Sequence, residues 1–330
     1  MGWLSFNLWE RMRHIEDINI CKPLTLSILP HQTTSYIPSS GRGTSDRFKT
    51  SFAENFEKAR EDNLLSVGSA RKLKRAINWM AYLSREKVVY VREINKRVKF
   101  RMSFITLTLP ASQIHTDSQI KSKCLMPFLQ WLRDKYNVKK YVWKAEAQKN
   151  GNIHFHISLD KFIHYQTLRN QWNRNVESLG YLTRYREESG KFTPPSTEIK
   201  AVKKVKNIAA YLTAYMASTR DSSSSKAKKE AESRFVEGRL WGISSYLVGL
   251  KGLRLSEEDG DFDTIMRFIH QNASSSFHKD FIHCYRYSGE VFEELIKVYC
   301  EFYGDQWLID GGFDEEDISL LSVGAVCLAA

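Results

Sequence analysis

Residues 139–159, KKYVWKAEAQKNGNIHFHISL, contain two β-rich stretches separated by a strong turn signal. Apolar and polar side chains alternate along Ile153–Leu159, as in a strand that buries one face. The intervening Lys149-Asn-Gly-Asn is typical of a tight turn, because asparagine and glycine adopt positive φ at little cost. We therefore predict a β-hairpin that joins Lys139–Gln148 to Ile153–Leu159.

The second strand of this hairpin carries His154-Phe-His156. Residues two apart on a strand point to the same face, so both imidazoles project side by side and could share one metal ion. Phe155 would then face the core. Such a pair can also be two solvated histidines on an exposed face, and the neighbouring residues have to distinguish the two interpretations.

A carboxylate, Glu146, lies eight residues before His154 across the turn. A two-residue loop would pair His154 with Ala147 and turn Glu146 away, whereas a three-residue loop with a bulge would place Glu146 opposite His154. Two histidines and a carboxylate leave open positions for substrate oxygens on Mg²⁺ or Mn²⁺. Gln148, on the same face as Glu146, is the competing third ligand. A structural zinc site is disfavoured because no cysteine pair lies nearby.

Two tyrosines are spaced for one helix face in Tyr211-Leu-Thr-Ala-Tyr215. Side chains at i and i+4 stack on a helix, so both hydroxyls could reach one site in turn. A phenol, with a pKa near ~10, needs a metal or a base to act as a nucleophile at neutral pH. The alternative is a core-packing stripe that includes Leu212 and Met216.

The remaining sequence alternates between helical and extended patterns. We expect a basic amphipathic helix over 69–83, further helices over 117–136, 165–179 and 207–219, and strands at 87–92, 100–110, 181–185 and 198–202. This order of elements predicts an α+β domain built on an antiparallel sheet with helices against one face.

We predict three parts of the chain: an N-terminal arm over 1–60, partly flexible; a catalytic domain over 61–250; and a small, mostly helical C-terminal module over 251–330. Residues 22–50 are rich in Ser, Thr, Pro and Gly, which favours an arm. The C-terminal module is acidic, with 6 basic and 16 acidic residues, whereas residues 1–250 have 43 basic and 22 acidic residues.

The net charge of +11 and the pI of about 9.3 indicate a polyanionic partner, either nucleic acid or an anionic membrane surface. The five cysteines are scattered without a C-x-x-C pair, and the sequence shows neither a leader peptide nor an apolar run long enough for a bilayer. We therefore expect a cytoplasmic protein. The absence of a phosphate-binding G-x-x-x-x-G-K-[ST] loop predicts no nucleotide cofactor.

Three motifs occur in a fixed order: Phe104-Ile-Thr-Leu-Thr-Leu-Pro, His154-Phe-His-Ile-Ser and Tyr211-Leu-Thr-Ala-Tyr-Met. In this order and spacing they resemble the motifs of HUH-superfamily rolling-circle replication initiators, notably the two-tyrosine initiators of small single-stranded DNA phages and plasmids. The resemblance extends over about residues 68–245 and includes Gly238-Arg-Leu-Trp-Gly-Ile-Ser.

The resemblance implies a five-stranded antiparallel sheet with the histidines on its central strand and a divalent cation bound there. It also implies nicking of single-stranded origin DNA through a 5′-phosphotyrosine, in the cytoplasm of a bacterial host. A host DNA polymerase would extend the free 3′-hydroxyl, and a host helicase would unwind the duplex. The implied catalytic residues are Tyr211 and Tyr215, and the implied metal ligands are His154, His156 and Glu146.

Basic residues expected to contact DNA phosphates cluster in two places: Lys72, Lys74 and Arg75, and Lys203, Lys204 and Lys206. The sequence departs from the family at two positions. A lysine commonly follows each tyrosine after three residues, and here Ala214 and Ser218 occupy those positions. Either one of the lysines of the second cluster or Arg220 would have to replace that lysine.

Three other readings remain. A relaxase or transposase uses the same histidines, although relaxases usually place the tyrosine before the histidine motif. A non-catalytic DNA-binding protein could have kept the fold, in agreement with the missing lysines. A packaging protein would explain the charge but not the ordered motifs.

Overall fold

The computed structural model describes residues 23–37, 63–91, 95–202, 234–279, 282–304 and 306–326. It forms two compact units. One consists of residues 45–249, and the other combines residues 1–44 with residues 250–330. Among the helices in these described ranges, none is both long and apolar enough to cross a bilayer.

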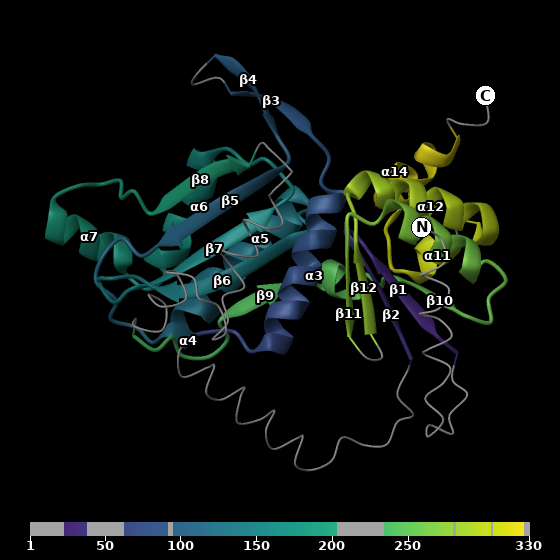
Figure 1. The fold of residues 1–330 in the computed structure, drawn as a ribbon. Helices are drawn as coiled ribbons and strands as arrows, with labels where there is room; N and C mark the ends of the chain where they lie inside the picture. The colour runs from purple at the N-terminus through teal and green to yellow at the C-terminus, as the bar shows by residue number, and fades with distance from the viewer. Residues whose placement is uncertain are drawn as a thin grey trace, which may run out of the picture. The chain divides into compact units, whose positions relative to one another are not determined.

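The unit of residues 45–249 is built on a five-stranded antiparallel sheet (Figure 1). Its strands are β5 (Met102–Thr108), β6 (Tyr141–Ala147), β7 (Ile153–Leu159), β8 (Thr197–Val202) and β9 (Trp241–Ile243). They lie in the order β8-β5-β7-β6-β9, so the histidine strand β7 is central. The expected α+β fold with a five-stranded antiparallel sheet is confirmed.

Helices cover the apolar face of this sheet. They are α4 (Asp117–Ile120), the π-helical turn η2 (Lys121–Leu125), α5 (Met126–Tyr136) and α6 (Tyr165–Glu177). The fully buried Trp172 of α6 packs edge-on against Phe155 of β7 and Phe128 of α5. Its indole nitrogen donates a hydrogen bond to the carbonyl of Thr108. Because Phe155 faces this core, its neighbours His154 and His156 face the other side of the sheet.

The expected basic helix is α3 (Val67–Leu83), which packs against β6, β9 and the short helix α10 (Ser245–Gly249). The hydroxyl of Ser66 caps it by accepting a hydrogen bond from the backbone N–H of Ser69. Apolar residues such as Leu73 and Ile77 are buried on one face. The opposite face is exposed and basic, which confirms the amphipathic prediction.

The strand predicted at 87–92 is β3 (Lys87–Val91), which pairs with β4 (Lys96–Phe100) in a separate two-stranded hairpin. The stretch predicted as one strand over 100–110 is therefore divided between β4 and β5.

The prediction of a strand over 181–185 is wrong, because this segment is the start of helix α7 (Tyr181–Ser189). Gly180 and Gly190, both at positive φ, define its two ends. The carboxylate of Glu177 accepts hydrogen bonds from the first free backbone N–H groups, those of Leu182 and Thr183. Tyrosine and threonine favour strands locally, but the capping carboxylate and the flanking glycines stabilise a helix here.

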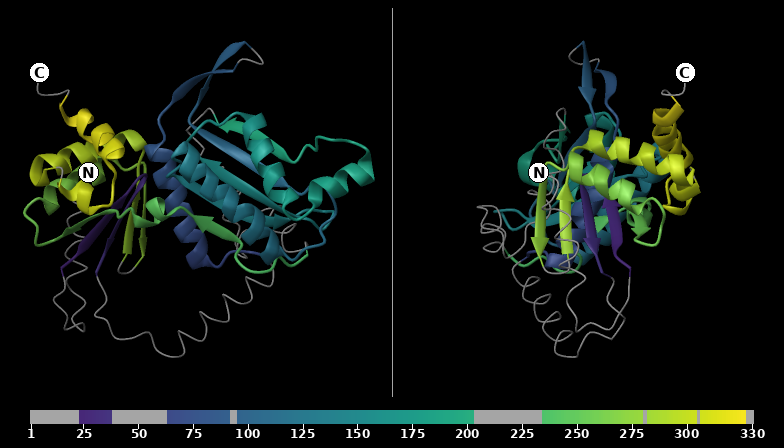
Figure 2. Two further views of the ribbon diagram at one scale, coloured as in Figure 1. Left: turned by 180° about the vertical axis from the view of Figure 1, so that it is seen from behind. Right: turned by 45° about the vertical axis from the view of Figure 1, so that its right-hand side comes forward.

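The second unit contains a five-stranded antiparallel sheet of its own. Its strands are β1 (Thr25–Leu29), β2 (Gln32–Tyr36), β10 (Leu253–Ser256), β11 (Ser275–Lys279) and β12 (Ile282–Arg286). The order is β10-β1-β2-β12-β11, so the two N-terminal strands lie in the middle. Figure 2 shows these strands (purple) beside the strands of the C-terminal part (green).

The described residues of this unit also form four helices: α11 (Phe262–Asn272), α12 (Gly289–Tyr303), α13 (Gln306–Asp310) and α14 (Glu315–Val326). The C-terminal part therefore has the expected helices, and in addition three strands that the sequence did not predict. Residues 25–36, which we expected within an arm over 1–60, are instead a hairpin of this unit. Leu26 and Ile28 are fully buried in it.

Candidate metal centre

The histidine hairpin adopts the register that brings its carboxylate to the histidines. Glu146 of β6 lies directly opposite His154 of β7. The backbone N–H of Gln148 donates to the carbonyl of Asn152, which leaves the three-residue loop 149–151. Gly151, at φ 83°, occupies the loop position that needs a left-handed residue. Of the two registers considered, the one with the three-residue loop is observed.

Three side chains converge on the face of the sheet opposite the core: Glu146, His154 and His156. The Oε2 atom of Glu146 is 3.5 Å from Nε2 of His154 and 3.5 Å from Nε2 of His156. The two imidazole centroids are 4.5 Å apart. One ligand atom from each side chain lies within 4.8 Å of the others, so the group can hold a metal ion.

This donor set fits a divalent cation. In octahedral coordination at about 2.1 Å, neighbouring ligand atoms are about 3.0 Å apart. The observed 3.5 Å separations between the carboxylate oxygen and each imidazole nitrogen are only slightly wider than this. Two imidazoles and one carboxylate supply three ligand atoms, and they leave other positions on a metal ion for oxygen ligands of a substrate.

The strands around the centre hold its ligands in place. The hydroxyl of Thr106 lies 3.2 Å from Nδ1 of His156, and when it accepts a hydrogen bond from that nitrogen, the Nε2 lone pair stays free for a metal. Phe104 stacks on the same imidazole at a centroid distance of 5.4 Å. The fully buried Lys144 places its Nζ 3.2 Å from Oε1 of Glu146. Oε2 of the carboxylate is thereby turned toward the imidazoles.

The electrostatic balance keeps Glu146 ionised. Burial alone would raise the pKa of its carboxyl. Without a bound cation, hydrogen bonds from Nε2 of His154 and of His156 and the positive charge of Lys144 outweigh burial, and they hold this pKa well below its usual range. An ionised carboxylate is the form that binds a cation.

The expected DNA-contacting residues of α3, namely Lys72, Lys74 and Arg75, are exposed on the basic face of that helix. The two tyrosines Tyr211 and Tyr215 and the second basic cluster, Lys203, Lys204 and Lys206, lie outside the described residues.

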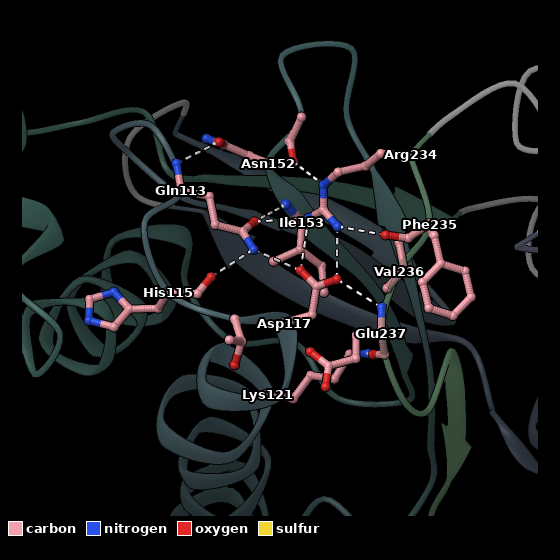
Figure 3. A network of polar contacts seen from close by, with 12 residues as sticks. Gln113, His115, Asp117, Lys121, Asn152, Ile153, Arg234, Phe235, Val236 and Glu237 are labelled. Atoms are coloured by element: carbon pink, nitrogen blue, oxygen red, sulfur yellow. Dashed lines mark hydrogen bonds and ion pairs between the residues drawn. The ribbon is translucent and has the colours of Figure 1, made fainter.

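A polar network anchors the chain where the described structure resumes after residues 203–233 (Figure 3). The guanidinium of Arg234 donates two hydrogen bonds of 2.8 Å to the buried carboxylate of Asp117 at the start of α4. The same carboxylate accepts hydrogen bonds from the side-chain amide of Gln113 and from the backbone N–H of Glu237. Burial raises the pKa of Asp117, but these four hydrogen bonds lower it below its usual value.

The network extends to the histidine hairpin. Arg234 also donates through Nε to the carbonyl of Gly151 in the hairpin loop. The side-chain amide oxygen of Gln113 accepts a hydrogen bond of 2.7 Å from the backbone N–H of Ile153, next to His154. From the other side, Asn63 bonds the carbonyl of Arg234 and the N–H of Val236. Residues 234–237 are therefore fixed to the loop beside the metal centre.

The sequence interpretation missed Lys144, Thr106 and the pair of Asp117 and Arg234. Lys144 could have been found, because it lies two residues before Glu146 and therefore on the same face. Thr106 could have been found only with the strand register. The partners Asp117 and Arg234 are separated by 117 residues, and no local pattern connects them.

The fold and the site define an α+β protein with an antiparallel sheet whose central strand carries two histidines that, with a neighbouring glutamate, could hold a metal ion. Residues 102–220 match the family model of replication-associated protein ORF2/G2P. The matched region begins with β5 and includes the whole candidate centre and both tyrosines. This match supports the expected relation to replication initiators. No curated protein and no solved structure matches the chain.

Proposed function

We propose that this protein initiates replication by nicking single-stranded origin DNA through a tyrosine, with a divalent cation bound at Glu146, His154 and His156. The observation that carries the proposal is the convergence of these three side chains on the central strand, within the region that matches a replication-associated family. A bound Mg²⁺ or Mn²⁺ would polarise the scissile phosphate and stabilise charge on its oxygens.

The ligand residues and their supports have separate tasks. His154, His156 and Glu146 hold the cation and so fix the position of the scissile phosphate. Lys144 keeps the carboxylate turned toward the imidazoles. The exposed cations of α3, including Lys72 and Arg75, bind the DNA backbone.

In the covalent step, the hydroxyl of Tyr211 or Tyr215 attacks the phosphorus atom. A bond forms between phosphorus and the phenolic oxygen, and the bond between phosphorus and the 3′-oxygen breaks. The phenol loses its proton, and the leaving 3′-oxygen takes up a proton to become a hydroxyl. The phosphotyrosine conserves the phosphodiester energy, so a 3′-hydroxyl can reverse the step and rejoin the strand.

The proposed 3′-hydroxyl would prime a host DNA polymerase, and a host helicase would separate the strands, both in the cytoplasm of a bacterial host. These partners are part of the proposal because rolling-circle synthesis needs both activities.

The test is capture of the covalent adduct. A pool of random-sequence single-stranded oligonucleotides, labelled at the 3′ end, is incubated with the protein and Mn²⁺, because the tyrosine retains the 3′ fragment. We expect a labelled protein band that disappears with EDTA, with Glu146→Gln and with the double variant Tyr211→Phe/Tyr215→Phe. The control Tyr165→Phe removes an exposed hydroxyl from α6 and should leave the band unchanged.

A band that persists in the double variant would refute the tyrosine assignment. No band in the wild type, together with tight binding of the same oligonucleotides, would identify the protein as a non-catalytic DNA-binding protein.

A further inference from the structure

A cavity of about 340 Å³ lies between the start of α3 and the segment that leads into β9. It is lined by Leu64, Leu65, Ser66, Ser69, Gly238, Arg239, Leu240 and Trp241. We call it the Trp241 pocket. Its size is at the lower end of the range for small-molecule sites, about 300–1,000 Å³, and is suited to a single nucleotide.

The Trp241 pocket lies on the same side of the sheet as the metal centre. Lys144 of β6 is paired with His156 of β7 on one side and with Trp241 of β9 on the other. Cross-strand partners point to the same face, so the three side chains form one row. Two strand spacings separate Trp241 from His156, which is about 10 Å. This separation allows a nucleotide next to a phosphate at the metal centre to reach the pocket.

The lining has the chemistry of a base-binding site. Trp241 is half-buried and is one of the residues that line the cavity. Leu64, Leu65 and Leu240 supply apolar walls. The hydroxyl of Ser69 adds a hydrogen-bonding group at the α3 side. An aromatic ring among apolar walls offers a stacking surface to any base.

The surroundings are positively charged. Exposed Arg239 lines the pocket itself. The helix α3 starts there, directs its N-terminal backbone N–H groups to that end and carries no acidic residue. Four cations follow within its first turns: Arg71, Lys72, Lys74 and Arg75. This positive charge favours binding of a polyanion over binding of a neutral ligand or of a peptide without acidic residues.

We infer that the Trp241 pocket binds one unstacked base of single-stranded DNA, stacked on Trp241, with the flanking phosphate at Arg239. The inference rests on the proposed function, because it assigns a subsite for the same substrate. It adds a residue that selects single-stranded DNA, since a base within a duplex is not available for the pocket.

The test compares two fluorescent probes in EDTA, so that no cleavage occurs: an oligothymidylate of about 20 nucleotides and an abasic chain of equal length and charge. Trp241→Leu should weaken binding of oligothymidylate by about 5- to 150-fold and leave binding of the abasic chain unchanged. Trp241→Phe keeps a ring and should recover most of the affinity. Trp131→Leu, at a half-buried tryptophan of α5 on the other face, is the matched control.

A second variant tests the same pocket without changing Trp241. Ser69→Phe fills the cavity from the α3 side and should also reduce affinity only for oligothymidylate. Arg239→Gln should instead weaken both probes equally and reduce the salt dependence of binding by about 0.7 in log–log slope.

Equal effects of Trp241→Leu and Ser69→Phe on both probes, or no effect on either, would overturn the inference. A wild-type protein that binds both probes equally well, or neither of them, would overturn it too. The outcome is separate from that of the adduct experiment. If the protein forms no adduct but binds oligothymidylate in a way that requires Trp241, the base-binding pocket is supported and the nicking function is refuted.

Discussion

The pair of Asp117 and Arg234 should stabilise the unit of residues 45–249 by several kcal/mol. Asp117 is 4% exposed and accepts four hydrogen bonds, two of them from Arg234 at 2.8 Å. Breaking a buried ion pair by removing one partner costs about 3–5 kcal/mol. Because the Arg234 side chain is 34% exposed, water can replace part of its contacts. We therefore expect Asp117→Ala to lower the free energy of unfolding by about 3 kcal/mol.

A double-mutant cycle separates the pair from its surroundings. Arg234→Ala should cost about 2 kcal/mol, and the double variant should cost less than the sum, with a coupling energy of about 2 kcal/mol. The assay is urea unfolding followed by tryptophan fluorescence. Hydrogen exchange should rise at the backbone N–H of Glu237, which loses its acceptor in Asp117→Ala. The exposed pair of Arg184 and Glu188, at 2.7 Å, is the control and should contribute under about 0.5 kcal/mol.

A coupling energy below about 0.5 kcal/mol would refute this reasoning, since the buried pair would then stabilise the protein no more than an exposed ion pair does. Unchanged exchange at Glu237 in Asp117→Ala would contradict the assignment of its hydrogen bond.

Three further predictions concern single groups. Gly151→Ala should lower the free energy of unfolding by about 1 kcal/mol, because Gly151 has a φ of 83°, which strains any residue with a Cβ although no atom lies close enough to clash with it. Gly249→Ala, at a position that has the same space but no positive φ, should be nearly neutral. Burial raises the pKa of the Cys124 thiol to about 12, so iodoacetamide should modify half-buried Cys284 before Cys124, as read by mass spectrometry. Burial, then two neighbouring histidines, lowers the pKa of His283. The unfolded chain therefore binds a proton at this histidine more readily than the folded protein does, so its contribution to stability is complete above about pH 6.5 and is lost as the pH falls below that value. His283→Gln should make Tm less dependent on pH below about 6.5.

The hairpin of the metal centre could be predicted from the sequence because all of its signals are local. The alternation in Ile153–Leu159 and the turn residues before it lie within one short stretch. The placement of His154 and His156 on one face followed from this alternation, whereas the central position of their strand was implied by the resemblance to replication initiators. Only the register was undecided, because it depends on the loop conformation at Gly151, which the sequence permits in more than one form.

The middle strands of the second unit could not be predicted, because their stabilising contacts are distant. Leu26 of β1 pairs with Leu255 of β10, and Thr34 of β2 pairs with Cys284 of β12. Each N-terminal strand has only five residues, and the surrounding Ser and Thr residues are typical of a loop. Tertiary pairing decides the structure of such segments.

The insertion of β1 and β2 between β10 and β12 affects how the chain folds during synthesis and how it can be shortened. The ribosome completes residues 45–249 before it makes β10 or β12, the two strands that pair with the N-terminal hairpin. Until then, both edges of that hairpin remain unpaired. A truncation that removes only residues 250–330 would leave these edges permanently open and invite aggregation. The smallest fragment to express for the unit of residues 45–249 therefore omits both ends together, and a circular permutant that joins the two termini would encode the second unit as one continuous stretch of chain.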